Sequence, residues 1–233
     1  MIKIIQTADP IKYAEMLKYT SGINRLYAYI HHHDFESYCG LKRGVAPVHA
    51  AYNRAYMLDE VINSGYRGWV LYLDADAYFN DLVFDVEDYL SRNSDFSFIA
   101  AEAGAHLSQK WAINNGIFFV NLGTPEGVWI CNNLKTLIDA NVPNQYWDDP
   151  EADWAPAEFD DQNLLYGVLA FDQRVLEKVK KESADVFNYN GTFIRQAIRA
   201  SADTFETILK NVRKECLRVK NDFQSKIDEA FFS

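Results

Sequence analysis

The chain has 233 residues, of which 48% are hydrophobic and 24% charged, a balance that is typical of a folded globular domain and excludes bulk disorder. Its formal net charge is −10, whereas nucleic-acid binding requires a positively charged surface, so we expect no nucleic-acid partner. The three cysteines lie far apart, and no stretch resembles a signal peptide or a transmembrane segment. We therefore expect a soluble, cytoplasmic protein without a disulfide framework.

Short apolar runs alternate with helical patterns along the first part of the chain. We expect a strand at 2–6, a helix from Asp9-Pro10 to about Thr20, a strand at 25–31, a helix at 47–63 and a strand at 69–73. The last of these runs, Trp69-Val-Leu-Tyr-Leu73, is apolar throughout, which predicts a central strand covered on both faces.

The alternation continues in the second part. We expect strands at 96–101 and 117–121, a helix begun by Thr124-Pro125 that runs to about Asp139, and a long loop at 141–156. Strands that alternate with helices predict an α/β fold, with a mainly parallel central sheet flanked by helices on both faces.

The character of the chain changes near residue 200. Beyond a capping-box-like start at Asp203 and Glu206, apolar residues recur at alternating spacings of four and three, from Phe205 to Phe223. We therefore predict a domain at 1–200 and a long helical extension at 201–233. The favoured interpretation is a helix packed on its own domain, and the alternative is a helix that forms a homodimer.

The strongest local signal is the sequence Leu71-Tyr-Leu-Asp74-Ala-Asp76, in which an apolar strand ends in two carboxylates. Ligand sites of open parallel sheets lie at the carboxyl ends of strands. Carboxylate oxygens suit Mn²⁺ or Mg²⁺, which can in turn bind phosphate oxygens. Asp-x-Asp alone is a weak motif, because acidic residues are common at strand ends.

Three further polar segments follow, and each has a plain structural explanation as well. Asn114-Asn-Gly116 forms a turn before a strand, Asp160-Asp-Gln162-Asn163 resembles a helix N-cap, and Asn188-Tyr-Asn-Gly191 precedes Arg195 and Arg199. If those two arginines lie one helical turn apart, they can hold a phosphate group together.

In this order the four segments resemble those of the GT-A fold nucleotide-sugar glycosyltransferases of the retaining type, especially family 34 and the glycogenin-like family 8. Asp74-Ala-Asp76 resembles the family's Asp-x-Asp motif, and Asn114-Asn-Gly116 resembles its Asn-x-Gly turn. Asp161-Gln162 resembles its Asp-Gln pair, and Asn188-Tyr-Asn-Gly191 resembles its final His-x-x-Gly motif. The resemblance covers the layout of roughly residues 1–200, and only these short segments are specific.

The resemblance implies transfer of a sugar from a nucleotide-sugar donor, most often a UDP-sugar, to a hydroxyl of a carbohydrate or another acceptor, with Mn²⁺ or Mg²⁺ as cofactor. It implies that Asp161 and Gln162 lie at the anomeric carbon as catalytic residues. The metal ligands implied are Asp74, Asp76 and Asn188. The implied donor contacts are Thr7, Arg54, Asp74, Asn114, Gly116 and Arg195.

The chain departs from the family pattern at its last motif. Asn188 stands where the family has a histidine that binds the metal, and the Lys-Pro-Trp that often follows in family 8 is missing. An amide oxygen is still a hard ligand. One alternative is therefore a nucleotide-sugar or carbohydrate-binding protein with weak or no catalysis. Another is a phosphatase of the haloacid dehalogenase type, although Ala77-Tyr78 does not fit that class.

Three smaller features have ordinary explanations. His31-His-His33 on a strand would point to alternate faces, which argues against a metal site. The pair Lys42-Arg43 is expected at the surface, with phosphate binding as the alternative. Trp147 and Trp154 in the long loop can either stack on sugar rings or anchor the loop.

Overall fold

The computed structural model describes residues 1–103, 108–197 and 204–232. Its strands are β1 (Lys3–Ala8), β2 (Asp34–Cys39), β3 (Trp69–Asp74), β4 (Ala77–Phe79), β5 (Phe98–Glu102), β6 (Ile113–Asn121), β7 (Val179–Glu182), β8 (Phe187–Asn188) and β9 (Ile194–Gln196). Its helices are α1 (Ala14–Ile30), α2 (Asn53–Asn63), α3 (Val86–Ser91), α4 (Pro125–Asn141), α5 (Asn144–Trp147), α6 (Asp161–Phe171), α7 (Gln173–Glu177) and α8 (Phe205–Phe232), and a 3₁₀ helix, η1, spans Pro47–Tyr52.

A six-stranded sheet with the order β2-β1-β3-β6-β5-β7 forms the centre of the molecule. Strand β6 is antiparallel to both of its neighbours, and the other pairs are parallel. A smaller sheet with the order β4-β9-β8 lies next to it. The predicted α/β architecture with a mainly parallel sheet is confirmed.

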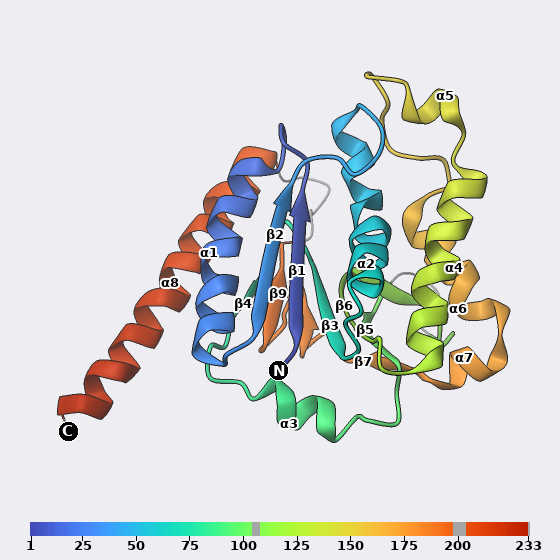
Figure 1. The fold of residues 1–233 in the computed structure, drawn as a ribbon. Coiled ribbons are helices and arrows are strands. Elements are labelled where there is room, and N and C mark those ends of the chain that lie inside the picture. Colours follow the sequence, from blue (N-terminus) through green and yellow to red (C-terminus); the bar gives the residue numbers. More distant parts are fainter. Residues whose placement is uncertain (104–107, 198–203, 233) are drawn as a thin grey trace.

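Helices cover both faces of the central sheet. Figure 1 shows α1 and α8 on one side and α2, α4 and α6 on the other. Leu71 and Leu73 of β3 pack in the apolar cluster on the α1 side, whereas Val70 and Tyr72 pack in the cluster on the α2 side. All four side chains are at most 1% exposed. The prediction that this strand is covered on both faces is therefore confirmed.

The prediction for residues 10–31 is wrong in two respects. Helix α1 does not end at Ser21-Gly22 but continues to Ile30, so it takes up the strand expected at 25–31. The apolar side chains of Ile23 and Tyr27 are buried against the sheet, and this packing outweighs the cost of about 1 kcal/mol for a helical glycine. The carboxylate of Asp9 does accept hydrogen bonds from the backbone N–H groups of Lys12 and Tyr13, but this turn precedes a helix that begins at Ala14.

Most of the other predicted elements overlap elements of the structure, which also contains β2, β4, α3, α7, β7, β8 and β9, for which there was no prediction. Strands β1, β3, β5 and β6 overlap the expected ranges, and the hydroxyl of Thr124 caps α4 by accepting from Gly127 N. The helix expected at 47–63 is divided into η1 and α2. The expected loop at 141–156 contains the short helix α5.

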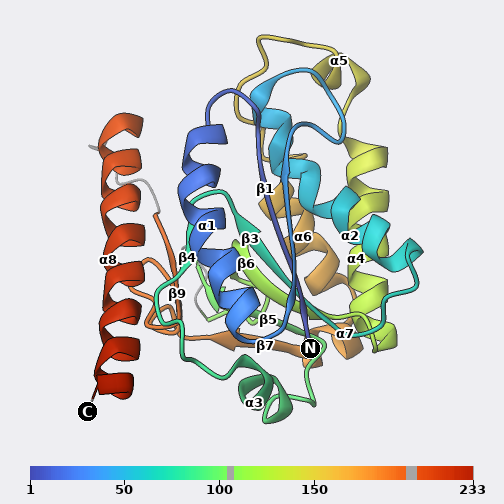
Figure 2. The ribbon, with the colours of Figure 1, turned by 60° about the vertical axis from the view of Figure 1, so that its left-hand side comes forward.

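The apolar stripe of α8 packs against α1. Val212, Cys216 and Val219 are buried in the same cluster as residues of α1, and the ring of Phe205 meets the ring of Tyr13 edge-on at 5.0 Å between centroids. Figure 2 shows α8 alongside α1 from a second direction. The favoured interpretation of this stripe, packing on its own domain, agrees with these contacts. Dimerisation through α8 and the boundary near residue 200 stay predictions, and the expected cap Asp203 lies outside the described residues.

In the described part of the chain, no helix combines the length and the apolar character needed to cross a lipid bilayer.

Candidate functional site

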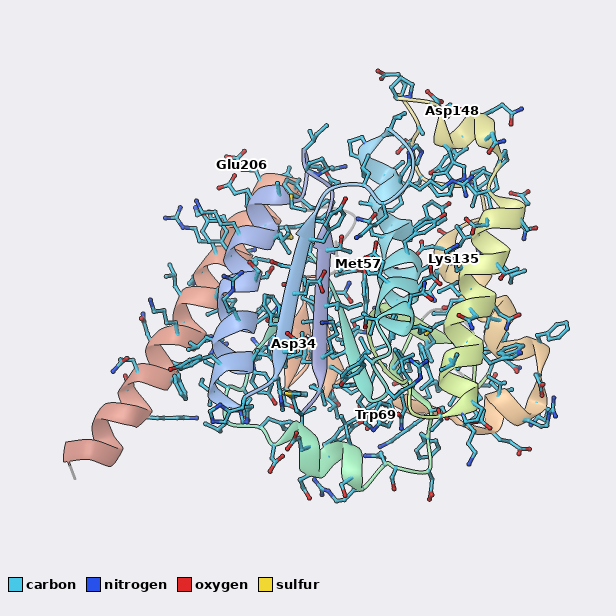
Figure 3. All side chains as sticks on the ribbon, in the orientation of Figure 1. Asp34, Met57, Trp69, Lys135, Asp148 and Glu206 are labelled. Atoms are coloured by element: carbon cyan, nitrogen blue, oxygen red, sulfur yellow. The ribbon has the colours of Figure 1, made fainter. Side chains whose placement is uncertain are left out.

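The two aspartates of the Asp-x-Asp motif lie in the turn between β3 and β4. Asp74 is the last residue of β3, where it pairs in register with Thr7 of β1, and Asp76 follows in the turn. In Figure 3 Trp69, at the start of β3, and Asp148, just after α5, lie at opposite ends of the molecule. The carboxyl end of β3 therefore points toward the α5 side, as expected for a ligand site of an open sheet.

A buried hydrogen-bond network holds this turn from the side of β1 and α1. Gln6 donates to the carbonyl oxygens of Asp74 and Ala77, both at 3.0 Å. Thr20 donates to Ala75 O at 2.7 Å, and Asn24 donates to Ala77 O and to Gln6 Oε1 at 3.0 Å each. The backbone of the turn is thereby fixed before any ligand binds.

Arg54 of α2 connects Asp74 with the start of α6. Its Nη2 lies 3.2 Å from Asp74 Oδ1 and 3.2 Å from Asp161 Oδ2, and its Nη1 donates to Asn115 O. The guanidinium is 4.9 Å from the centre of the Tyr72 ring, and Tyr72 also donates to Asp74 Oδ1 at 2.8 Å. One buried cation thus holds two carboxylates that are 87 positions apart in the chain (161 − 74).

The Asp-Gln pair at the start of α6 is attached to β6 through Asn115. Asn115 Nδ2 donates to Asp161 Oδ2 at 2.7 Å, and Asn115 N donates to Gln162 Oε1 at 3.0 Å. The helix itself is capped by Asp160, which accepts from Gln162 N and Asn163 N. Gln162 Nε2 is buried and has no partner within the described residues, so this N–H group is available to a ligand.

Asn114 and Asn188 bind each other rather than the aspartates. Asn114 Nδ2 donates to Asn188 Oδ1 at 3.3 Å, and Asn188 Nδ2 donates to Glu102 O at 3.4 Å. Asn114 Oδ1 accepts from Gly116 N at 2.6 Å. Both amide atoms of Asn188 therefore already have protein partners.

Gly116 is the point at which β6 meets Asp74 and Gln196. A Cβ atom there would lie 2.7 Å from Asp74 Oδ2 and 2.3 Å from Gln196 Nε2, so no larger residue fits without displacing them. Gln196 Nε2 lies 3.4 Å from Asp74 Oδ2, and Gln196 Oε1 is buried without a hydrogen-bond partner in the described structure. No sequence motif predicted a role for Gln196.

Burial raises the pKa values of the carboxyl groups of the site. The pKa of Asp76 rises to about 8, chiefly through burial and further through the Asp74 carboxylate, whereas the Gln196 amide and Arg54 oppose the rise. Burial raises the pKa of Asp161 to about 6, against the attraction of Arg54. The pKa of Asp74 is also raised by burial, with Arg54 and the Tyr72 hydroxyl opposing it. The carboxyl groups of the site are therefore protonated more easily than free carboxyl groups, and a bound cation would favour their ionised forms.

The residues present fit a hard divalent cation. Asp76 Oδ1 is a buried carboxylate oxygen without a partner among the described residues, and the unpartnered oxygen of Gln196 belongs to the neighbouring strand β9. Carboxylate and amide oxygens are the ligands that Mn²⁺ and Mg²⁺ take. The described residues contain no cluster of three or more His, Cys, Asp and Glu side chains that could hold a metal, so a third ligand from this part of the chain would be an amide, hydroxyl or backbone oxygen.

Two of the predicted donor contacts have protein partners away from the aspartates. The Thr7 hydroxyl accepts a hydrogen bond from Asn53 at 2.8 Å. The prediction that Arg195 and Arg199 lie one turn apart on a helix is wrong for Arg195, because Arg195 lies in strand β9. Arg199 lies outside the described residues. The guanidinium of Arg195 lies 3.3 Å from Glu215 of α8. Donor binding by Thr7 and Arg195 stays a prediction.

The smaller sequence features take mostly structural positions. His31 ends α1 and the ring of His33 lies 5.8 Å from it, so the two do not share a strand. Lys42 pairs with Glu60, whereas Arg43 pairs with Asp139 and lies over the Trp147 ring.

The two tryptophans of the long loop have different environments. Trp147 is only 3% exposed and anchors the loop, whereas Trp154 is 62% exposed. The structure therefore divides the pair, and only Trp154 can offer its ring to a ligand in solution.

Sequence reasoning missed Tyr72, Asn115 and Gln196. Tyr72 and Asn115 belong to two of the motif segments. Only the register of the strands directs the Tyr72 hydroxyl to Asp74 and the Asn115 amide to Asp161. Gln196 stands next to Arg195, and strand alternation would have distinguished the two if the segment had been recognised as a strand.

No protein-family profile and no curated protein sequence matches the chain. Solved structures do match it. A glycosyltransferase involved in glycosylation of the major capsid of PBCV-1 has a TM-score of 0.65 at 14% identity, with 91% of this chain and 98% of that chain covered. GlyE of Streptococcus pneumoniae TIGR4 has a TM-score of 0.54 at 14% identity, with 96% and 63% covered.

A third structure, the bifunctional glycosyltransferase WbbM, has a TM-score of 0.51 at 10% identity, with 94% of this chain and 51% of that chain covered. The chain thus spans nearly the whole of the first match, but less than two thirds of the other two. All three proteins are described as glycosyltransferases. At this identity the likeness concerns the fold, and the chain has a GT-A type α/β fold.

Proposed function

We propose that the chain is a metal-dependent glycosyltransferase that moves a sugar from a nucleotide-sugar donor, a UDP-sugar, to an acceptor hydroxyl with retention of configuration. The observation that carries the proposal is Asp76 just after the end of β3, a partly buried side chain whose Oδ1 atom is buried without a partner among the described residues, in a fold shared with solved glycosyltransferases. Burial of an unpaired carboxylate costs stability, so its presence calls for a positive ligand.

Asp74 and Asp76 would hold Mn²⁺ or Mg²⁺ in this proposal. The cation supplies positive charge that binds the donor diphosphate and stabilises the charge growing on it as it leaves. Arg54 keeps Asp74 in place through its ion pair and frees the outer oxygen, Oδ2, for other contacts. Thr7, Asn114 and Gly116 are proposed as donor contacts at the same end of the sheet.

The start of α6 would face the reacting carbon of the sugar. Asp161 is held by Arg54 and Asn115, and with a pKa of about 6 it is mainly ionised at neutral pH. Its negative charge favours a transition state in which the sugar is cationic, as in glycoside hydrolysis. The free Nε2 of Gln162 can donate a hydrogen bond to a sugar hydroxyl. Asp161 thus provides charge, and Gln162 provides orientation.

A donor panel tests the proposal. UDP-, GDP- and dTDP-sugars are incubated with the protein in Mn²⁺ or in EDTA, and thermal stabilisation and release of the free nucleoside diphosphate are measured. We expect one nucleotide to stabilise the protein only with metal, and slow release of its diphosphate by transfer to water. Asp76→Asn should abolish both effects, whereas full activity of this variant in excess EDTA would refute the mechanism.

A second candidate is a protein that binds nucleotide sugars without catalysis. The residue that favours it is Asn188, which stands where the family pattern has a metal-binding histidine. The Asn188 side-chain amide is hydrogen-bonded to Asn114 and to the backbone of Glu102. The same panel separates the two functions: metal-dependent UDP binding without any release of diphosphate supports the binding protein. The phosphatase alternative has no support from the structural matches, since all three reported are glycosyltransferases.

A further inference from the structure

We propose that Gln196 supplies its amide oxygen as the third protein ligand of the divalent cation, in the position that the sequence assigned to Asn188. This inference rests on the proposed function, because it concerns the same cation between Asp74 and Asp76. It names a residue outside the four motifs that suggested the family.

The backbone of β9 is tied to the Asp-x-Asp turn on both sides of the Gln196 side chain. Gln196 pairs in register with Ala77 of β4, and Ala197 N donates to Asp76 O at 3.2 Å. The position of Gln196 relative to both aspartates is therefore set by main-chain hydrogen bonds. A ligand on such a frame loses little conformational entropy when it binds.

The side chain of Gln196 is directed at the aspartates and is not satisfied there. It is only 8% exposed, its Nε2 lies 3.4 Å from Asp74 Oδ2, and its Oε1 lacks a partner in the part of the chain that the structure describes. Asp76 Oδ1 lacks one as well. A divalent cation would coordinate both oxygens at once, and its positive charge would favour the ionised form of Asp76, in which neither oxygen carries a proton to donate to the other.

Gly116 provides the space for this arrangement. A Cβ atom at this position would lie 2.7 Å from Asp74 Oδ2 and 2.7 Å from Gln196 Oε1. The absence of a side chain on β6 is therefore what allows the carboxylate and the amide to approach each other. In this proposal, the glycine of the Asn-x-Gly turn leaves room for the Asp74 carboxylate and the Gln196 amide to bind the same cation.

Asn188 is the rival ligand, and its contacts argue against it. Its oxygen accepts from Asn114 and its amide donates to Glu102 O, so neither polar atom is left over. Among the described contacts, no hydrogen bond joins Asn188 to Asp74 or Asp76. To bind the cation, the Asn188 oxygen would have to share or give up the hydrogen bond that it accepts from Asn114, whereas the Gln196 oxygen has no partner to lose among the described residues.

The test measures binding of Mn²⁺ alone, from the electron paramagnetic resonance signal of the free ion, for matched variants. Gln196→Met keeps the shape of the side chain but removes the oxygen, and we expect it to weaken Mn²⁺ binding tenfold or more. Asn188→Leu is the matched control, and it should change the affinity by less than twofold. Circular dichroism and the unfolding temperature without metal check that each variant is folded.

Gln196→Glu separates a ligand from a residue that only positions Asp74. Glutamate retains an oxygen but cannot donate to Asp74 when ionised. We expect Gln196→Glu to bind Mn²⁺ at least as well as the wild type. Loss of binding in this variant, unchanged binding in Gln196→Met, or loss in Asn188→Leu alone would each overturn the assignment.

The failure of this assignment is distinguishable from failure of the proposed function. If the wild type binds Mn²⁺ and transfers sugar while Gln196→Met binds the ion normally, only the ligand assignment is wrong. If the wild type binds no Mn²⁺, the ligand assignment and the metal dependence are both wrong, and sugar transfer measured in EDTA then decides whether the enzyme functions without metal.

Discussion

Two buried polar clusters lie on opposite sides of the same turn, and they differ in how completely their atoms are paired. The support cluster consists of Gln6, Thr20 and Asn24, whose side chains are all fully buried. Its polar atoms all have hydrogen-bond partners, most of them in the turn 74–79. The site cluster consists of Asp76, Gln162 and Gln196, and each of these has a buried polar atom without a partner among the described residues.

The difference separates stability from function within one short segment. A satisfied buried network fixes the backbone, whereas an unsatisfied one costs free energy in the absence of ligand. The turn between β3 and β4 can present groups without partners on one side because the support cluster holds it on the other. Substitutions in the two clusters should therefore change stability in opposite directions.

The largest effect is expected in the support cluster. Asn24→Leu leaves Phe79 N and Gln6 Oε1 without their partners in a dry interior, so we expect the free energy of unfolding to fall by about 4 kcal/mol. Urea unfolding followed by circular dichroism measures it. The matched control is Asn141→Leu at the exposed end of α4, which should cost less than about 1 kcal/mol. Equal losses in both variants would mean that the support cluster has no special role.

A somewhat smaller effect is expected where the site cluster meets β6. Gly116→Ala forces Asp74 Oδ2 and the Gln196 amide away from a new Cβ atom, so we expect the transfer rate to fall about 100-fold, or about 3 kcal/mol. Diphosphate release under saturating donor measures it. In Gly167→Ala of α6 the new Cβ has no neighbour within 4 Å, so this control should keep full activity and gain about 0.5 kcal/mol of stability.

A third effect has the opposite sign and depends on pH. The pKa of Asp76 is about 8 in the folded protein and near 4 in the unfolded chain. Between these values the folded state holds a proton that the unfolded state has lost, so this group lowers the free energy of unfolding as the pH rises from 4 to 8. Asp76→Asn should remove that slope.

Four pH units correspond to about 5 kcal/mol for a group without solvent contact. Because Asp76 is partly exposed to solvent, we expect Asp76→Asn to be about 2 kcal/mol more stable than the wild type in EDTA at pH 9, with no difference near pH 4. Thermal unfolding across the pH range measures it. Addition of Mn²⁺ should stabilise the wild type and leave the variant unchanged. A variant that is less stable than the wild type at pH 9 would show that the carboxylate is satisfied within the protein.

The smallest effect is expected at Arg195, outside both clusters. Its ion pair with Glu215 is about one-third exposed, so Arg195→Gln should cost only about 0.5 kcal/mol of stability. A donor KM that stays within threefold would show that the guanidinium serves only its contact with α8. A tenfold rise in KM would instead support the donor contact that the sequence predicted.

The sequence alone predicted the α/β class and the elements β1, β3, β5, β6 and α4, and it placed the proposed chemistry directly after β3. Apolar runs such as Trp69–Leu73 are buried on both faces in any α/β sheet, and a pair of aspartates after such a run falls at the ligand edge by topology. It failed at α1, because local signals at Ser21 and Gly22 carry about 1 kcal/mol, less than the burial of Ile23 and Tyr27 on the sheet.

Only the tertiary structure decided which polar groups face the aspartates. Arg54, Asp161 and Gln196 come from three elements that are far apart in the chain, and the direction of each side chain depends on strand register and helix packing that no local pattern records. The sequence could name Asn188 from its motif, but the Asn188 oxygen accepts a hydrogen bond from Asn114, while the Gln196 oxygen has no partner among the described residues. Motifs fix the types of atoms available, and the packing of the chain fixes which of them are left unpaired.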